Sequence, residues 1–157
     1  MALTHAWHDM RDEMHDLATF NRVDAARQAY LGLWATFIAV PLLFGLDKLF
    51  GFMTDNWEGY LATWANDVLP GTASDAVMWF GIIELALAAC VALVPRVGGD
   101  LFALWMLLGA CSLFAIDGMA HLAIGVLALG LCALAMARMS TAYHHTEPAH
   151  RAPGEAV

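Results

Sequence analysis

Four long apolar stretches follow one another along this chain, and they limit its possible folds more than any other feature. They run over Tyr30–Phe52, Asp75–Val94, Gly98–Phe114 and Gly118–Met139. A helix needs roughly 20 mostly apolar residues to cross about 30 Å of hydrocarbon. Charged residues make up only 14% of the chain, whereas soluble domains contain about 25%. The sequence therefore predicts an all-α integral membrane protein, an antiparallel four-helix bundle.

The distribution of basic residues predicts how the bundle is oriented. Lys and Arg gather in the cytoplasmic connections of membrane proteins. The first long connection, residues 53–74, contains neither, and the arginines flank the spans on the other side: Arg11, Arg22, Arg27, Arg96, Arg138 and Arg151. We therefore expect a multi-pass protein of the plasma (inner) membrane with both termini in the cytoplasm. Residues 53–74 and the turn near Asp117 should then face outward.

Net charge and cysteine content exclude some classes of protein. The net charge of −8 disfavours nucleic-acid binding, which needs a basic surface. Cys90, Cys111 and Cys132 all lie in apolar stretches, and none belongs to a C-x-x-C pair. We expect them to be small packing residues, with redox chemistry as the alternative.

The first segment of the chain, residues 1–29, is predicted to form an amphipathic helix. Its apolar residues recur at three- and four-residue steps and make one stripe: Trp7, Met10, Met14 and Leu17. Such a helix can lie in the membrane interface or pack on a partner protein, and both interpretations stay open. The segment lacks the apolar core of a signal peptide.

The remaining segments are a membrane domain, residues 30–139, and a polar tail, residues 140–157, which we predict to be disordered. Within the domain, the outer loop is rich in Trp and Tyr, which favour the membrane–water interface. A short interfacial helix is therefore expected around Trp57–Asn66, and Val94–Gly99 should form a tight turn.

Five ionisable residues in the spans are the candidates for a functional site. Such groups are costly at membrane depth and usually face the interior of the bundle. Asp47, Lys48, Glu84, Asp117 and His121 should all lie in the outer half, where they would form an outward-opening polar pocket. Lys48 can pair with Glu84, while Asp117 and His121 are four apart and should share a helix face. The alternative is that these pairs only fix the order of the helices.

The sequence gives little support for a metal or haem site. His121 is the only histidine within a span, so a haem held by two histidines is not expected. His8, Asp12 and His15 have a spacing that can hold a metal, but an exposed polar helix face explains them better. Aromatic residues of the spans could line a quinone cleft or face lipid: Trp34, Trp79, Phe80, Phe102, Trp105 and Phe114.

Several short motifs resemble those of the DoxX family of small four-helix membrane proteins. In that family a glycine and then a lysine with a hydrophobic residue end the first helix, as do Gly45 and Lys48-Leu49 here. A segment similar to the family's G-x-x-E element follows at Gly81-Ile-Ile-Glu84. The outer loop with Tyr60-Leu61 and Pro70, and the turn at Pro95-Arg96, also fit.

The resemblance covers about residues 30–138 and implies a function. The family includes subunits of thiosulfate:quinone oxidoreductase and proteins linked to thiol and oxidative-stress chemistry. It implies a subunit of a quinone- or thiol-linked redox complex, with quinone as the cofactor and Lys48 and Glu84 as the polar pair. Besides the bilayer, the expected partners are other membrane subunits or further copies of the chain. The added N-terminal helix favours an alternative, an accessory subunit that stabilises a larger complex without chemistry. Whether the protein is an enzyme stays open, and no catalytic residue is assigned.

Overall fold

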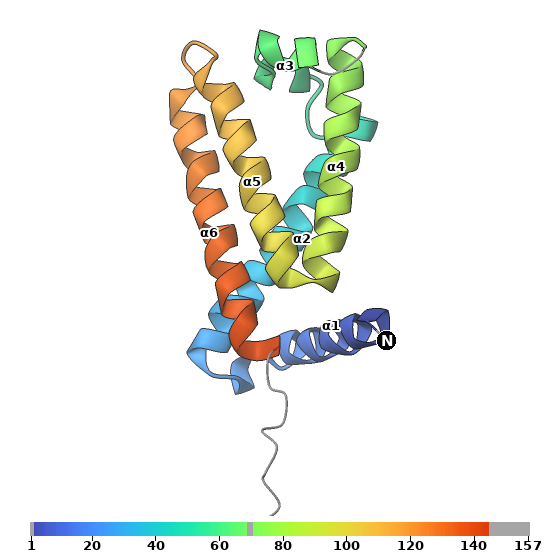
Figure 1. The fold of residues 1–157 in the computed structure, drawn as a ribbon, viewed down its shortest axis with the longest axis vertical. Helices are drawn as coiled ribbons and strands as arrows, with labels where there is room; N and C mark the ends of the chain where they lie inside the picture. Colours follow the sequence, from blue (N-terminus) through green and yellow to red (C-terminus); the bar gives the residue numbers. More distant parts are fainter. Residues whose placement is uncertain (1, 69–70, 145–157) are drawn as a thin grey trace, which may run out of the picture.

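The computed structural model describes residues 2–68 and 71–144, and within these ranges the chain is helical and contains no strand. Four long helices form an antiparallel bundle (Figure 1): α2 (Ala25–Phe50), α4 (Ala73–Leu93), α5 (Pro95–Phe114) and α6 (Ala120–His144). All four are long and apolar enough to cross a membrane. The predicted four-helix membrane bundle is confirmed.

The shorter elements lie at the two ends of the bundle. Helix α1 (Ala2–Ala18) lies across one end, which we call the α1 end, and the 3₁₀ turn Phe20–Arg22 joins it to α2 (Figure 1). The opposite end, which we call the loop end, carries a 3₁₀ turn at Trp57–Tyr60 and the short helix α3 (Thr63–Val68). The single interfacial helix predicted around Trp57–Asn66 is therefore two short pieces.

Polar caps place the helix starts earlier than the apolar stretches suggested. The Asp24 carboxylate accepts hydrogen bonds from the N–H groups of Ala26 and Arg27, so α2 begins one turn before Tyr30. Thr72 and Asp75 form a reciprocal capping box that starts α4. Such caps satisfy the orphan N–H groups of a first turn, and they lie outside any hydropathy signal because their residues are polar.

The connection between α4 and α5 is shorter than predicted. Instead of a turn over Val94–Gly99, only Val94 separates the helices, because Pro95 starts α5 directly. Proline suits this first helical position, where its missing N–H costs nothing. A Cβ atom at Gly98 would lie 2.4 Å from the backbone nitrogen of Val91. Only glycine allows the two helices to approach this closely after so short a connection.

The C-terminal boundary also differs from the prediction. Helix α6 continues to His144, and Ser140 is buried with its hydroxyl donating to the Ala137 carbonyl. Residues 140–144 therefore belong to the bundle and not to a tail. The rest of the predicted tail, 145–157, lies outside the described residues.

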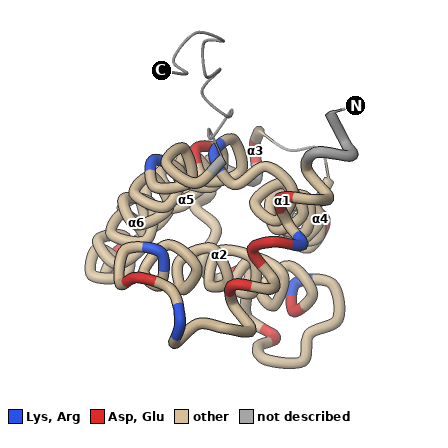
Figure 2. The backbone as a smooth tube through the Cα atoms, turned by 90° about the horizontal axis from the view of Figure 1, so that it is seen from below, with Lys and Arg blue, Asp and Glu red and all other residues tan. Residues whose placement is uncertain are grey.

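The core is concentrated where the four helices meet, and the outer faces are apolar. The main buried cluster includes Tyr30, Trp34, Phe37, Phe102 and Met136. No span has more than two-fifths of its most apolar window buried in the bundle. Figure 2, which views the bundle from the α1 end, shows that few backbone positions belong to Lys, Arg, Asp or Glu and that most belong to other residues. Apolar side chains in this number on the outside indicate that the helices contact a lipid bilayer.

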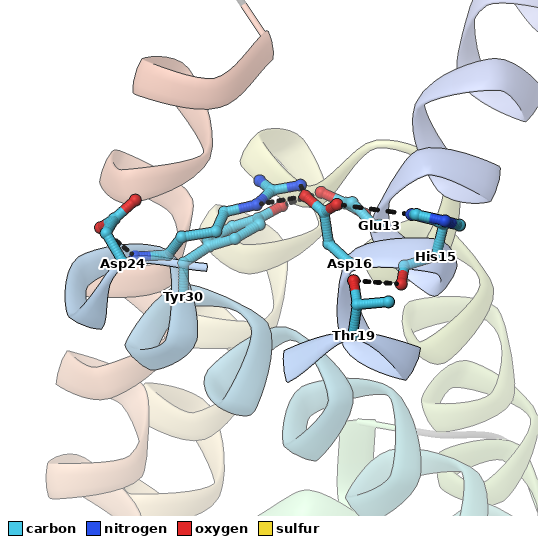
Figure 3. Close-up of polar contacts among 7 residues, drawn as sticks. Glu13, His15, Asp16, Thr19, Asp24 and Tyr30 are labelled. Carbon is cyan, nitrogen blue, oxygen red and sulfur yellow. Dashed lines mark hydrogen bonds and ion pairs between the residues drawn. The ribbon is translucent and has the colours of Figure 1, made fainter. Parts of the chain in front are cut away.

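Two acidic residues attach α1 to the bundle. Glu13 is only 1% exposed and accepts a hydrogen bond from the Tyr30 hydroxyl. The Asp16 carboxylate accepts from Arg27, whose Nη2 lies 2.9 Å away. Both carboxylates point from α1 toward α2 (Figure 3). The Arg27 guanidinium also lies over the Tyr143 ring, 4.6 Å from its centroid, so α6 takes part in the same contact.

The buried face of α1 is not the predicted apolar stripe. Met10 and Leu17 pack against the main core, and Glu13 lies between them. The other two residues of the stripe, Trp7 and Met14, are 61% and 55% exposed. A periodicity argument based on apolar residues misses Glu13, because its burial depends on partners from α2. Two residues of the predicted stripe therefore pack within the chain, and the other two are exposed to its surroundings.

Candidate functional site

Helices α2 and α4 cross closely at two glycines. A Cβ atom at Gly45 would lie 2.8 Å from the Gly81 carbonyl oxygen, and one at Gly81 would lie 2.9 Å from the Gly45 carbonyl oxygen. Small residues let membrane helices approach backbone to backbone. This crossing lies three residues before Lys48 on α2 and three before Glu84 on α4, so both side chains project from the same contact.

Lys48 and Glu84 form an ion pair next to the crossing. The Lys48 Nζ lies 2.8 Å from Oε2 and 3.0 Å from Oε1 of Glu84. The two side chains are only 8% and 9% exposed. A buried charge is tolerated when it is paired and hydrogen-bonded. Here the ammonium provides the opposite charge and the hydrogen-bond donors for the carboxylate, and the carboxylate provides the opposite charge and the acceptors for the ammonium. The predicted pairing of Lys48 with Glu84 is confirmed.

Helix α5 contributes a third group to the ion pair. The Trp105 indole Nε1 lies 3.4 Å from Glu84 Oε1 and donates a long hydrogen bond to it. The Trp105 ring meets the Phe80 ring edge to face, with 5.2 Å between the centroids. The Glu84 carboxylate is therefore held by an ammonium from α2 and an indole from α5, and the indole packs against Phe80.

Asp47, the neighbour of Lys48, is used differently. It is completely buried, and its carboxylate accepts hydrogen bonds from the Met53 N–H and, at 2.7 Å, from the Trp57 indole Nε1. The chain can return over the helix end because Gly51 adopts the left-handed conformation, with φ +63°, which glycine reaches without strain. Asp47 therefore ties the outer loop down, and Lys48 faces Glu84.

A cavity of about 410 Å³ opens at the loop end beside these residues. Lys48 is the only Lys or Arg in its wall, and acidic side chains line much of the rest. Asp75 is already engaged in the capping box of α4, and Asp47 is engaged with the loop. This excess of negative charge favours a neutral ligand over an anionic one. The wall consists of Asp47, Lys48, Leu49, Gly51, Thr54, Asp55, Trp57, Glu58, Ser74, Asp75, Val77 and Met78.

Asp117 and His121 do not join this site. Asp117 lies in the turn between α5 and α6, and Gly118 follows with φ +82°. His121 is in the first turn of α6, which begins at Ala120. The prediction that the two share a helix face is wrong, because Asp117 lies in the turn before α6, where Gly118 adopts a left-handed conformation. Both residues are exposed, and neither lines the cavity beside Lys48.

The other candidate groups also lie apart from the ion pair. The three cysteines are free, and Cys111 and Cys132 are exposed on helix surfaces. In the described part of the chain, no three His, Cys, Asp or Glu side chains are placed to hold a metal ion. Of the aromatic residues considered for a quinone cleft, Trp34 and Phe102 are buried in the core, whereas Trp79 and Phe114 are exposed.

Three features of the site and its surroundings escaped the sequence interpretation. Trp57 and Trp105 act through their indole N–H groups, and tryptophan in a membrane protein normally signals only an interface. Asp100, in the second turn of α5, has a buried Oδ1 atom, although it stands in a predicted span and could have been counted with the other ionisable residues. The signal available for Trp105 was its position on a helix that packs against α4.

Comparison with known proteins adds no family: family models, curated proteins and solved structures contain no match to this chain.

Alanine at the glycine crossing should separate α2 from α4. We expect Gly45→Ala to destabilise the protein by about 1–3 kcal/mol, the usual cost of overpacking a tight contact. The measurement is thermal unfolding in mild detergent. Gly32→Ala on the same helix is the matched control, because a Cβ there meets nothing within 4 Å. Equal effects of the two substitutions would show that the crossing is not a tight contact.

Removing one member of the ion pair should be worse than removing both. Lys48→Met or Glu84→Gln leaves a buried group without its partner, and we expect a loss of about 3–5 kcal/mol for each. The double variant should recover part of this loss in a double-mutant cycle measured by unfolding in detergent. Arg96→Met, at an exposed site, should change little. Strictly additive losses would contradict an energetic coupling between Lys48 and Glu84.

Proposed function

We propose that the protein is a DoxX-like membrane subunit of a quinone-linked redox complex, and that the cavity beside Lys48 receives the quinone head group. The observation that carries this proposal is the buried Lys48–Glu84 pair next to the cavity at the loop end. Ionisable groups held at membrane depth are functional candidates by default. The motifs that resemble the DoxX family contain both members of the pair and both crossing glycines.

The charges around the cavity favour a quinone over an anionic sulfur substrate. A quinone is neutral and offers carbonyl oxygens, which accept hydrogen bonds. The Lys48 ammonium has three N–H donors, and its two bonds to Glu84 leave a third for such an oxygen. An anion would instead meet the acidic side chains Asp55, Glu58 and Asp75 in the cavity wall. The subunit would bind the quinone, and its electrons would come from a partner subunit.

The alternative is an accessory subunit that stabilises a larger complex. Trp7 and Met14 favour it, since both are exposed on α1 and would suit contact with another chain. In this case the Lys48–Glu84 pair would serve only to fix α2 against α4.

Retention of quinone during gentle purification separates the two functions. We expect the wild-type protein, purified in mild detergent, to retain about one quinone per chain by extraction and chromatography. The Lys48→Met/Glu84→Gln double variant, which lacks the Lys48 ammonium and leaves no unpaired buried charge, should lose the quinone. Arg96→Met should retain quinone like the wild type. Stoichiometric partner chains without quinone would favour the accessory subunit instead.

We further propose an inner-membrane location with the loop end outward and the α1 end in the cytoplasm. The described arginines support this orientation, since they belong to α1, the 3₁₀ turn after it, and the ends of α2, α5 and α6 that meet there: Arg11, Arg22, Arg27, Arg96 and Arg138. Among the described residues, Lys48 is the one Lys or Arg near the loop end, and it is neutralised by Glu84.

This orientation predicts which cysteines react from outside the cell. In a background without the three native cysteines, Asn56→Cys should be modified by a membrane-impermeant maleimide in intact cells. Arg22→Cys, at an exposed site on the α1 end, should react only after the membrane is opened. The reverse pattern would place the cavity on the cytoplasmic face.

A further inference from the structure

One aromatic side chain covers the charged end of Lys48. The Lys48 Nζ lies 3.7 Å from the centroid of the Trp57 ring and 5.7 Å from that of Phe44. A cation is attracted to the face of an indole, most strongly where water is excluded. Since Glu84 occupies another side of the ammonium, Trp57 lies where a ligand from the cavity would have to approach.

The position of Trp57 depends on Asp47. The indole Nε1 donates to Asp47 Oδ2 at 2.7 Å, and the other carboxylate oxygen accepts from the Met53 N–H of the same loop. Asp47 is completely buried, so its carboxylate is already removed from solvent when it accepts these hydrogen bonds. It does not touch Glu84 in any hydrogen bond among the described residues, so its contacts are to the loop.

The loop is held by hydrogen bonds at both ends, and the contacts of Trp57 lie between them. It leaves α2 at Gly51, whose N–H donates to the Asp47 carbonyl oxygen. At the far end the Ala62 N–H donates to Ser112 Oγ on α5 at 3.0 Å. Between these anchors the Trp57 ring also contacts the rings of Phe44 and Tyr60.

From this arrangement we propose that residues 51–61 form a lid over the Lys48–Glu84 pair, and that Asp47 is the positioning residue that holds the lid shut through the Trp57 indole. A ligand reaches the free donor of Lys48 only when Trp57 leaves both the carboxylate and the ammonium. This lid would control entry of a ligand to the cavity. It rests on the proposed function only for the identity of that ligand as a quinone.

The chain offers a direct measure of this access because Lys48 is its only lysine. A sulfonated N-hydroxysuccinimide ester can be applied to the purified protein in detergent after any retained quinone has been removed by exhaustive detergent washing. The rate of Lys48 modification is then read from its peptide by mass spectrometry. Trp57→Ala, Trp57→Phe and Asp47→Leu should each raise this rate by about tenfold, because each removes the hydrogen bond between the indole N–H and the charged carboxylate. Trp64→Ala is the matched control, an exposed tryptophan of the same outer segment, and should leave the rate unchanged.

A double variant separates positioning from a general loosening of the fold. If Asp47 acts through the Trp57 N–H, then Asp47→Leu/Trp57→Phe should label no faster than either single variant, with helical circular dichroism unchanged. Rates that multiply in the double variant would overturn the role of Asp47, and a wild-type rate in Trp57→Ala would overturn the lid itself. If Asp47→Leu does not fold, the comparison of Trp57→Phe with Trp57→Ala still decides whether the N–H holds the ring. Because no quinone is present, the lid stands or fails independently of quinone retention.

Discussion

A lysine and a glutamate buried together inside an apolar bundle are the constraint on which the rest of this structure depends. Neither charge could remain there alone, because each ion removed from water without its partner would cost several kcal/mol. The pair therefore requires α2 and α4 to be close, and Gly45 and Gly81 provide this by removing side chains from the crossing. The loop, its tryptophan and the cavity all take their positions from the helix end that this crossing fixes.

The same means of packing recurs elsewhere in the bundle. At Gly98 the backbones of α4 and α5 nearly touch, and at Gly99 a Cβ would meet Ala133, Met136 and Ala137 of α6 within 3.0 Å. Lipid offers no hydrophobic drive for helices to associate, so close van der Waals contact must supply it. Glycines without such contacts, such as Gly32 and Gly125, show that this is a property of the crossings and not of glycine in general.

The sequence predicted those features that depend on hydropathy or on the cost of an isolated charge. It was less informative about side chains whose roles depend on their partners in the folded chain. Hydropathy located all four spans, and the cost of isolated charges was enough to pair Lys48 with Glu84. Glu13 was missed because a buried carboxylate looks like any solvated one until Tyr30 is placed against it. The predicted Asp117–His121 pair was wrong because helical spacing was assumed across Gly118, whereas Asp117 and Gly118 both lie in the turn before α6. The role of Trp57 was invisible, since it depends on a loop that folds back onto Asp47.

The charged residues have different partners at the two ends of the bundle. At the α1 end, Glu13 and Asp16 meet Tyr30 and Arg27, and the Arg27 guanidinium is stacked on Tyr143, so three helices are joined and that end is closed. At the loop end, the acidic groups surround a cavity and only one tryptophan stands over the ammonium. A ligand site and a partner surface would therefore not compete for the same residues. If the exposed Trp7 and Met14 on α1 contact another subunit and the Lys48–Glu84 pair serves a ligand at the loop end, the two proposed functions would use separate parts of one chain.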